Sequence, residues 1–148
     1  MKVNLISERL LLTLWVGSLW AIGYLAVPMA FATLGDITLA GNYAGKLFSA
    51  VNILGLGCGA VLLISSFISH GKQAAKYWRF WVLLLMVVLT LVFSCYLQPE
   101  IAEIKQLTSQ DDAILERFAL FHVISKNLYL IVSLLGLALV ISSDKAEG

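Results

Sequence analysis

The sequence predicts an all-α membrane protein, in which four transmembrane helices form one bundle with both termini in the cytoplasm. Three observations predict this class. Of the 148 residues, 60% are hydrophobic and only 13% are charged, whereas a soluble domain is about half apolar and about a quarter charged. Four apolar runs are about as long as a bilayer core of roughly 30 Å requires. Basic residues are unequally divided between the two sides that these runs create.

The composition also excludes several classes of protein. The shortage of charge, with a mean hydropathy of +0.91, excludes a soluble globular enzyme and a disordered chain. The net charge is +1 and there is no basic stretch, so nothing indicates nucleic-acid binding. Cys58 and Cys95 lie inside apolar runs, and they form neither a disulfide framework nor a CxxC pair.

We expect a single domain over residues 1–148, with spans at about 10–34, 47–68, 80–97 and 119–141. Continuous apolar runs predict helices, because lipid leaves no partner for an unpaired backbone group. The glycine-containing segment 35–46 is predicted as a connection. A short amphipathic helix is expected at about 99–108, after Pro99, and Ser109 resembles the N-cap of a fourth helix that begins near Gln110. No internal repeat is apparent in the sequence.

The basic residues predict the orientation. Four spans place both termini and residues 69–79 on one side of the membrane. Six basic residues lie on that side and three on the other, which places the termini in the cytoplasm by the positive-inside rule. The predicted location is therefore a bacterial inner membrane, crossed several times. The six are Lys2, Arg9, Lys72, Lys76, Arg79 and Lys145, and the three are Lys46, Lys105 and Arg117.

Each predicted helix carries a stripe of small or polar residues at steps of three and four, which share one helix face. Such residues mark helix–helix contacts in membranes, so all four stripes are expected to face the bundle interior. Gly55-x-x-x-Gly59 is expected to let the second helix approach a neighbour. The stripes are Thr13, Gly17, Trp20, Tyr24 and Pro28; Gly45, Ser49, Asn52, Gly55 and Gly59; Thr90, Ser94 and Gln98; and His122, Lys126, Tyr129, Ser133 and Gly136.

Polar residues gather near the outer surface in this topology. Lys126 is costly in a membrane helix, and it either extends its amine to the surface or pairs with Glu100 or Glu116. His122 is a packing residue, a metal or haem ligand, or a group that exchanges protons near neutral pH. Met29, Cys95 and His122 could ligate a soft metal, but no two have ligand spacing on one helix. We therefore predict no metal and no cofactor.

Three segments carry a resemblance to a known family. They are residues 14–34, residues 40–48, and the pair LQPEI at 97–101 with RFALFHVISKNLYL at 117–130. In their order and spacing they resemble the small bacterial membrane proteins of domain-of-unknown-function family 4149, which are related to eukaryotic transmembrane protein 205. The resemblance implies a four-helix membrane protein with no established reaction. The family's usual His-Gly-x-Ser start to the fourth helix reads His122-Val123-Ile124-Ser125 here, without the glycine.

These observations together define a candidate outer-leaflet polar cluster. It consists of Asn52, Gln98, Glu100, His122, Ser125 and Lys126, with Tyr24, Pro28 and Cys95 nearby.

The favoured function is that of a non-enzymatic membrane protein that binds a partner or serves as an accessory subunit. One alternative is a transporter or exporter of a small solute or metal ion that acts as an oligomer. Another is a haem- or redox-linked membrane protein. The expected partners are the lipid bilayer and either a second copy of the chain or a larger membrane complex, with no nucleic acid.

Overall fold

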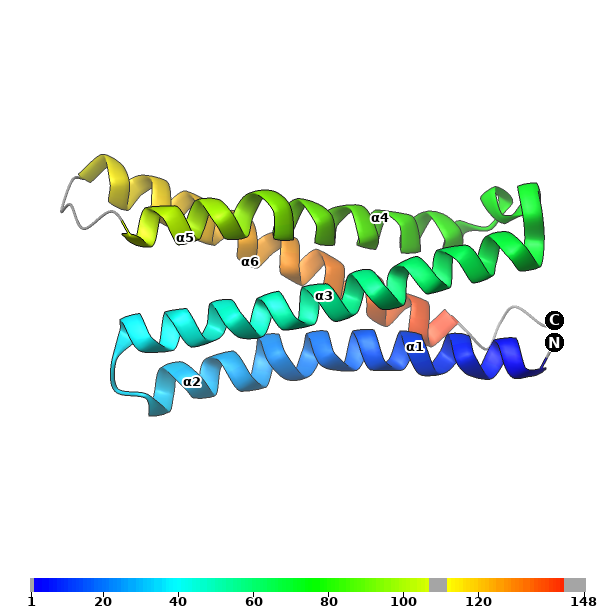
Figure 1. Cartoon of the computed structure of the whole chain (residues 1–148), viewed down its shortest axis with the longest axis horizontal. Coiled ribbons are helices and arrows are strands. Elements are labelled where there is room, and N and C mark those ends of the chain that lie inside the picture. The colour runs from blue at the N-terminus through cyan, green and yellow to red at the C-terminus, as the bar shows by residue number, and fades with distance from the viewer. Residues whose placement is uncertain (1, 107–111, 143–148) are drawn as a thin grey trace.

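Helices account for nearly all of residues 2–106 and 112–142, which the computed structural model describes, with side chains from residue 6 onward. Four stretches are long and apolar enough to cross a membrane, namely Ile6–Thr33, Ile37–Lys76, Trp78–Gln106 and Asp112–Ile141. The predicted class, a four-helix membrane protein, is confirmed. The elements are α1 (Lys2–Ala21), π-helical η1 (Ile22–Ala26), α2 (Val27–Thr33), α3 (Ile37–His70), 3-10-helical η2 (Gly71–Lys76), α4 (Trp78–Val92), π-helical η3 (Phe93–Leu97), α5 (Gln98–Gln106) and α6 (Asp112–Ile141) (Figure 1).

The helices alternate in direction across the bundle. α1 and α4 run one way, and α3 and α6 run the other way (Figure 1). The end at which α1 begins and α6 ends is called the terminal end below. The opposite end, which holds α2, α5 and the start of α6, is called the loop end.

The first connection is shorter than the sequence predicts. α3 begins at Ile37, so most of the predicted connection 35–46 is helical. The Asp36 carboxylate caps this helix, because its Oδ1 accepts hydrogen bonds from the backbone N–H groups of Thr38 (2.7 Å) and Leu39 (3.2 Å). Gly35 makes the turn at φ +65°, a conformation that favours glycine. Polar residues at 35–46 therefore begin a helix instead of interrupting one.

Both prolines lie just after a π-helical turn. The Val27 N–H bonds the Ile22 carbonyl, and the Gln98 N–H bonds the Phe93 carbonyl, so each bond spans five residues instead of four. A proline ring inside a helix clashes with the carbonyl four residues earlier, and the wider turn accommodates Pro28 and Pro99. The helix therefore continues through Pro99 into α5. The expected amphipathic helix is this extension of α4, and Leu107, Ser109 and Gln110 lie outside the described residues.

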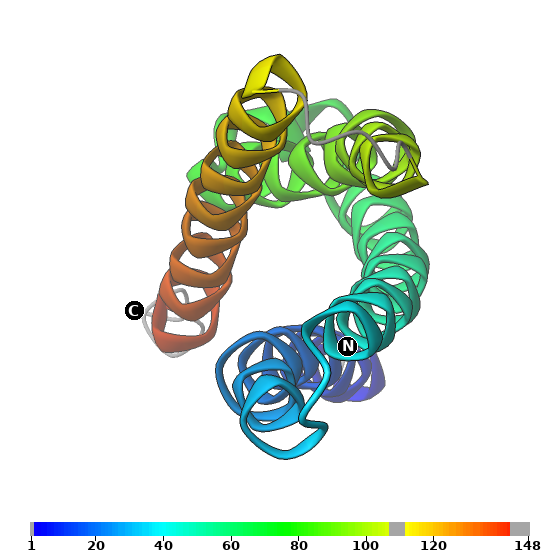
Figure 2. The same cartoon turned by 90° about the vertical axis from the view of Figure 1, so that its left-hand side faces the viewer.

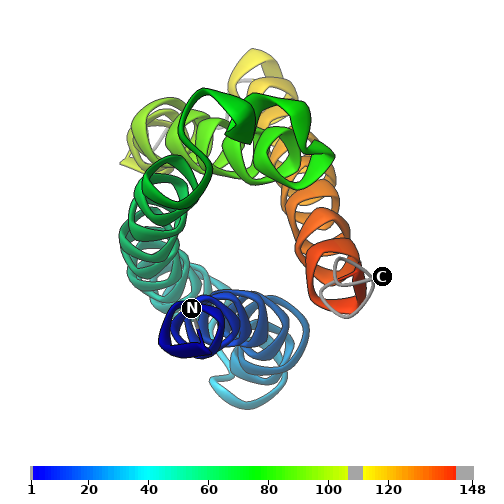
Figure 3. The same cartoon turned by 90° about the vertical axis from the view of Figure 1, so that its right-hand side faces the viewer.

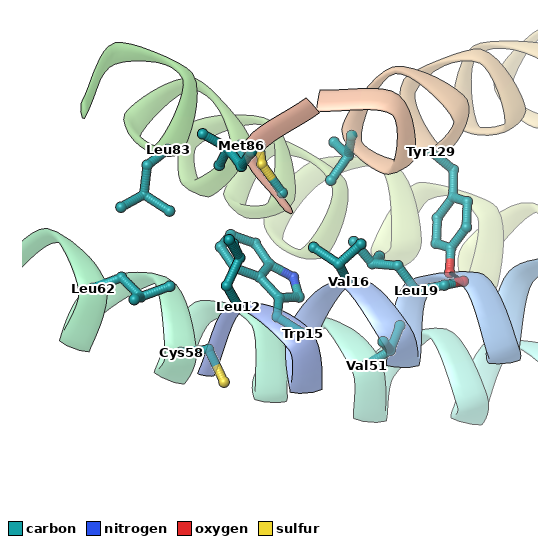
Figure 4. Packing of buried hydrophobic residues seen from close by; sticks show 12 residues of the cluster. Leu12, Trp15, Val16, Leu19, Val51, Cys58, Leu62, Leu83, Met86 and Tyr129 are labelled. Atoms are coloured by element: carbon teal, nitrogen blue, oxygen red, sulfur yellow. Dashed lines mark hydrogen bonds between the residues drawn. The ribbon is translucent and has the colours of Figure 1, made fainter. Parts of the chain in front are cut away.

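The four long helices form a ring in the order α1, α3, α4, α6 (Figures 2 and 3). Trp15 and Met86 fill its centre and are fully buried (Figure 4). A Cβ atom at Gly55 would overlap the indole ring of Trp15. The expected close approach at Gly55-x-x-x-Gly59 is therefore confirmed, and the neighbour is α1.

The first predicted stripe does not face the interior. Its five residues, from Thr13 to Pro28, are all exposed, and α1 instead buries Trp15, Val16 and Leu19. Lipid is as apolar as a leucine side chain, so hydrophobicity does not select the inner face of a helix. Shape selects it here, because large side chains of α1 enter the space left by glycines of α3.

The two halves of the chain repeat one another, which the sequence did not predict. Leu12, Trp15 and Leu19 of α1 are buried, and the residues 71 positions later in α4 are buried as well; these are Leu83, Met86 and Thr90. The two prolines, 28 and 99, have the same separation. Dissimilar side chains at matched positions, such as Trp15 and Met86, conceal this repeat in the sequence.

The second helix of each half obeys the same symmetry. A Cβ at Gly59 of α3 would overlap Val87 and approach Trp15, whereas a Cβ at Gly136 of α6 would overlap Val16 and approach Met86. Gly59 of the first half thus meets Val87 of the second half, and Gly136 of the second half meets Val16 of the first half. A twofold rotation relates these two contacts. The residues of α3 therefore correspond to those 77 positions later in α6, and the bundle has a pseudo-twofold axis along its length.

Candidate functional site

The first and last membrane-spanning segments separate at the loop end of the bundle. The start of α6 lies beside α5, while α2 lies on the opposite side of the bundle end (Figure 2). Nearer the centre, α6 packs against α1 at Val16 and Gly136. The two segments therefore diverge toward the loop end, and the region between α2 and the start of α6 is called the seam below.

Tyr129 forms the base of the seam. Its hydroxyl donates a 2.5 Å hydrogen bond to the backbone carbonyl of Leu19, and its ring occupies the space in which Gly23 lacks a side chain. Insertion of a side chain into a helix is one cause of a local distortion, and η1 begins three residues after Leu19. Tyr129 and Pro28 thus both favour the π-turn from which α2 diverges.

Aromatic rings surround Tyr129. Its ring centroid lies 5.1 Å from that of Phe48, 6.4 Å from that of Phe93 and 6.1 Å from that of Tyr24. Tyr24 is 42% exposed, and its ring centroid lies 4.8 Å from that of Trp20, with the two rings tilted by 36°. The base of the seam is therefore an aromatic surface that has its exposed edge at Trp20 and Tyr24.

His122 and Lys126 lie on the α6 wall of the seam. They continue the stripe of Tyr129 and Ser133 at steps of three and four, and that stripe faces α1 through the Tyr129–Leu19 bond. Both residues are exposed, because α2 has diverged at their level. The prediction that this stripe faces the interior is thus correct for Tyr129 and Ser133 and wrong for His122 and Lys126.

The predicted polar cluster is divided among separate places. The Gln98 amide donates to the Gly45 carbonyl (3.2 Å) and accepts from the Ser49 hydroxyl (3.3 Å), so it joins η3 and α5 to α3. Lys105 strengthens the same contact through the Gly41 carbonyl (3.1 Å). These bonds close the loop-end contact that is the symmetry counterpart of the seam.

Glu100 is engaged elsewhere. Its carboxylate forms an ion pair with Arg117 at 2.8 Å, and the guanidinium of Arg117 lies 5.7 Å from the centroid of the Phe121 ring. The alternative in which Lys126 pairs with Glu100 is therefore wrong, because Arg117 of α6 occupies this carboxylate. Among the described residues, the structure records no hydrogen bond or ion pair for Lys126.

Asn52 lies deeper than the seam. It is 4% exposed, and its Nδ2 has no hydrogen-bond partner among the described residues. It lines a small cavity of about 10 Å³ together with Thr90, Phe93 and Tyr129. This volume is close to the space that one water molecule needs. Ser125 is buried on the same helix as His122, and its hydroxyl likewise has no hydrogen-bond partner among the described residues.

The remaining candidates lie at exposed positions. Pro28 and Cys95 are exposed. The His122 ring stacks on Phe118 of its own helix, with ring centroids 6.1 Å apart. Within the described ranges, no group of three or more His, Cys, Asp or Glu side chains is arranged to hold a metal ion.

Two contacts at the terminal end were missed by sequence reasoning. The Ser65 hydroxyl donates to the Glu8 carboxylate (3.0 Å), and the Arg79 guanidinium donates to the Ser142 hydroxyl (3.0 Å). They tie α1 to α3 and α4 to α6. The sequence signal for them is one charged residue near the start of the first and third spans, namely Glu8 and Arg79.

Comparisons with known proteins agree with these observations. A family model described as a domain of unknown function (DUF4149) matches residues 10–110. This range extends from α1 through the described part of α5. No curated protein and no solved structure matches the chain.

Proposed function

Because the chain belongs to the DUF4149 family, whose function is unknown, we propose its role from the geometry: it is a non-enzymatic binding protein of the bacterial inner membrane. It holds another membrane component in the seam between α2 and α6. One observation carries this proposal. The stripe that packs on α1 through Tyr129 continues outward to two exposed polar residues, His122 and Lys126, which nothing in the described chain covers.

The symmetry-related contact between α5 and α3 shows how such a contact is closed. There, Gln98 and Lys105 of α5 donate hydrogen bonds to the Gly45 and Gly41 carbonyls of α3. Among the described residues, no such hydrogen bond is recorded between α2 and α6, although these helices occupy the equivalent place in the repeat. Its side chains are therefore available to a second molecule from the bilayer.

The distribution of polar groups supports binding rather than transport. A transport path requires polar groups along the whole membrane depth. In the described residues, the terminal half of the core is formed by apolar side chains, including Leu12, Leu62, Leu83 and Leu139. The haem-linked alternative has no comparable support, because the exposed His122 stacks on Phe118 of its own helix.

Site-specific photo-crosslinking in native membranes tests the proposal. p-Benzoylphenylalanine is placed at His122, inside the seam, or at Leu120, which is 58% exposed on another face of α6 at a similar depth. We expect a discrete adduct from His122 that is absent from Leu120, where only the surrounding bilayer lipid is labelled. An adduct of twice the mass identifies a second copy of the chain as the component. Identical labelling patterns at the two positions contradict the proposal.

A further inference from the structure

We propose that the component held in the seam is an anionic phospholipid, whose phosphate is bound by Lys126 and His122 and whose acyl chain lies along the aromatic base. This inference rests on the proposed function and specifies its ligand. The shared chemistry is a phosphate group, which a lipid or a free phosphate ion could supply. The observations favour the lipid for three reasons.

The first reason comes from the internal repeat. The α6 residues 77 positions after Gly41, Gly45 and Ser49 are Phe118, His122 and Lys126. In α3, the small residues allow Gln98 and Lys105 to reach backbone carbonyls. In α6, large side chains stand at the corresponding positions and keep α2 away. The α3 positions at which the related contact closes are therefore matched in α6 by larger side chains, among them the cationic Lys126.

The second reason is the depth of Lys126. The Arg79–Ser142 bond marks the polar boundary at the terminal end. Lys126 precedes Ser142 by 16 residues, or roughly 24 Å at about 1.5 Å per residue. A hydrocarbon core of about 30 Å places the Lys126 backbone roughly 6 Å below the loop-end surface. A lysine at this depth extends its amine toward the headgroups, where lipid phosphates lie.

The third reason is the combination of charge and apolar surface. The carboxylate of Glu100 is already paired with Arg117, so the ammonium of Lys126 is not neutralised by it. Met29 on α2 and Val123 on α6, next to His122, are exposed apolar side chains at the same end of the bundle. A phospholipid supplies both an anion for the ammonium of Lys126 and an acyl chain for the apolar side chains. An acidic side chain on a partner helix would first have to be buried in hydrocarbon, which is costly.

Native mass spectrometry of the full chain, released from nanodiscs of phosphatidylglycerol and phosphatidylcholine, tests the inference. We expect retained phosphatidylglycerol at high occupancy and little phosphatidylcholine. Lys126→Gln should weaken phosphatidylglycerol binding about fivefold, as expected for one basic residue near a membrane surface. Lys46→Gln is the matched control, because Lys46 is an exposed lysine at the same end of the bundle. Its effect on phosphatidylglycerol binding should be clearly smaller than that of Lys126→Gln.

Several outcomes overturn the inference. They are equal retention of both lipids, equal effects of the two substitutions, or displacement of bound lipid by millimolar inorganic phosphate, which identifies a free-ion site. The failure of the lipid assignment is distinguishable from the failure of the proposed function. A protein adduct from position 122 in the crosslinking experiment excludes the lipid but preserves the binding role. The same labelling at positions 122 and 120 contradicts both the lipid assignment and the proposed binding role. Thermal unfolding in detergent without added lipid checks that Lys126→Gln is folded.

Discussion

Tyr129 holds the backbone of Leu19 at the level where the first and last membrane-spanning segments separate. A side chain of α6 thus bonds a main-chain carbonyl of α1, near the π-turn η1. The contact joins residues 110 positions apart, and it couples the position of α6 to the direction of α2. Its removal should affect both the stability of the bundle and the width of the seam.

Tyr129→Phe removes this hydrogen bond and keeps the aromatic packing. We expect a loss of about 0.6–1.7 kcal/mol in unfolding free energy, the range for hydrogen bonds between membrane helices. Tyr43→Phe is the control, because Tyr43 is 51% exposed. Unfolding in mixed micelles measures both variants. Equal stability of Tyr129→Phe and the unmodified protein would show that the bond contributes nothing.

Gly55→Ala should be much more damaging than Gly57→Ala. A Cβ at Gly55 overlaps the buried indole ring of Trp15, whereas nothing lies within 4 Å of a Cβ at Gly57. Overpacking of this kind typically costs about 1–3 kcal/mol. Gly57→Ala, two residues away on the same helix, should leave the thermal midpoint unchanged. The prediction is wrong if both substitutions lower the midpoint equally.

Two substitutions of Asn52 test whether its buried amide has a bound partner. An unsatisfied buried donor costs about 1–3 kcal/mol, so Asn52→Leu should leave stability unchanged or increase it. Asn52→Asp should be strongly destabilising, because it buries a carboxylate without a countercharge. Thermal unfolding of the two variants provides the measurement. A loss with Asn52→Leu comparable to that with Asn52→Asp would mean that the amide binds a group, such as water, in the adjoining cavity.

The predicted orientation can be tested with single cysteines in intact cells. A cysteine at Gln73, in the 3-10 turn η2, should be protected from an impermeant maleimide. A cysteine at the exposed Glu116, at the loop end, should react. The exposed Cys95 is replaced by serine in both proteins. Stronger labelling at position 73 than at position 116 would reverse the topology and place the seam in the cytoplasmic leaflet.

The spanning helices could be predicted from the sequence because bilayer thickness fixes the length of each apolar run. Their ends could not be predicted equally well. Asp36 is a single polar residue between apolar ones, and its capping role depends on backbone geometry. Pro99 indicated a break, but the π-turn before it lets the helix continue.

The site was harder to predict than the fold. Helical spacing correctly grouped Tyr129 with Ser133, because both contact neighbours in the ring. It wrongly placed His122 and Lys126 inside, because spacing does not show that α2 diverges from α6. Glu100 was one of two carboxylates considered as partners of Lys126, yet Arg117 lies 2.8 Å from it. Side-chain partners between helices depend on rotation and tilt, which a single sequence does not contain.

The internal repeat also bears on how such a protein could arise and insert. Because α1 and α4 run in the same direction, the two hairpins enter the membrane with identical orientation. Duplication and fusion of one ancestral hairpin therefore require no reversal of topology, unlike inverted repeats, whose halves insert in opposite senses. An ancestor of this kind would have been a symmetric dimer with two equivalent contacts of this type. In the present chain, Gln98 joins the helices at one of them, whereas the other carries the exposed His122 and Lys126.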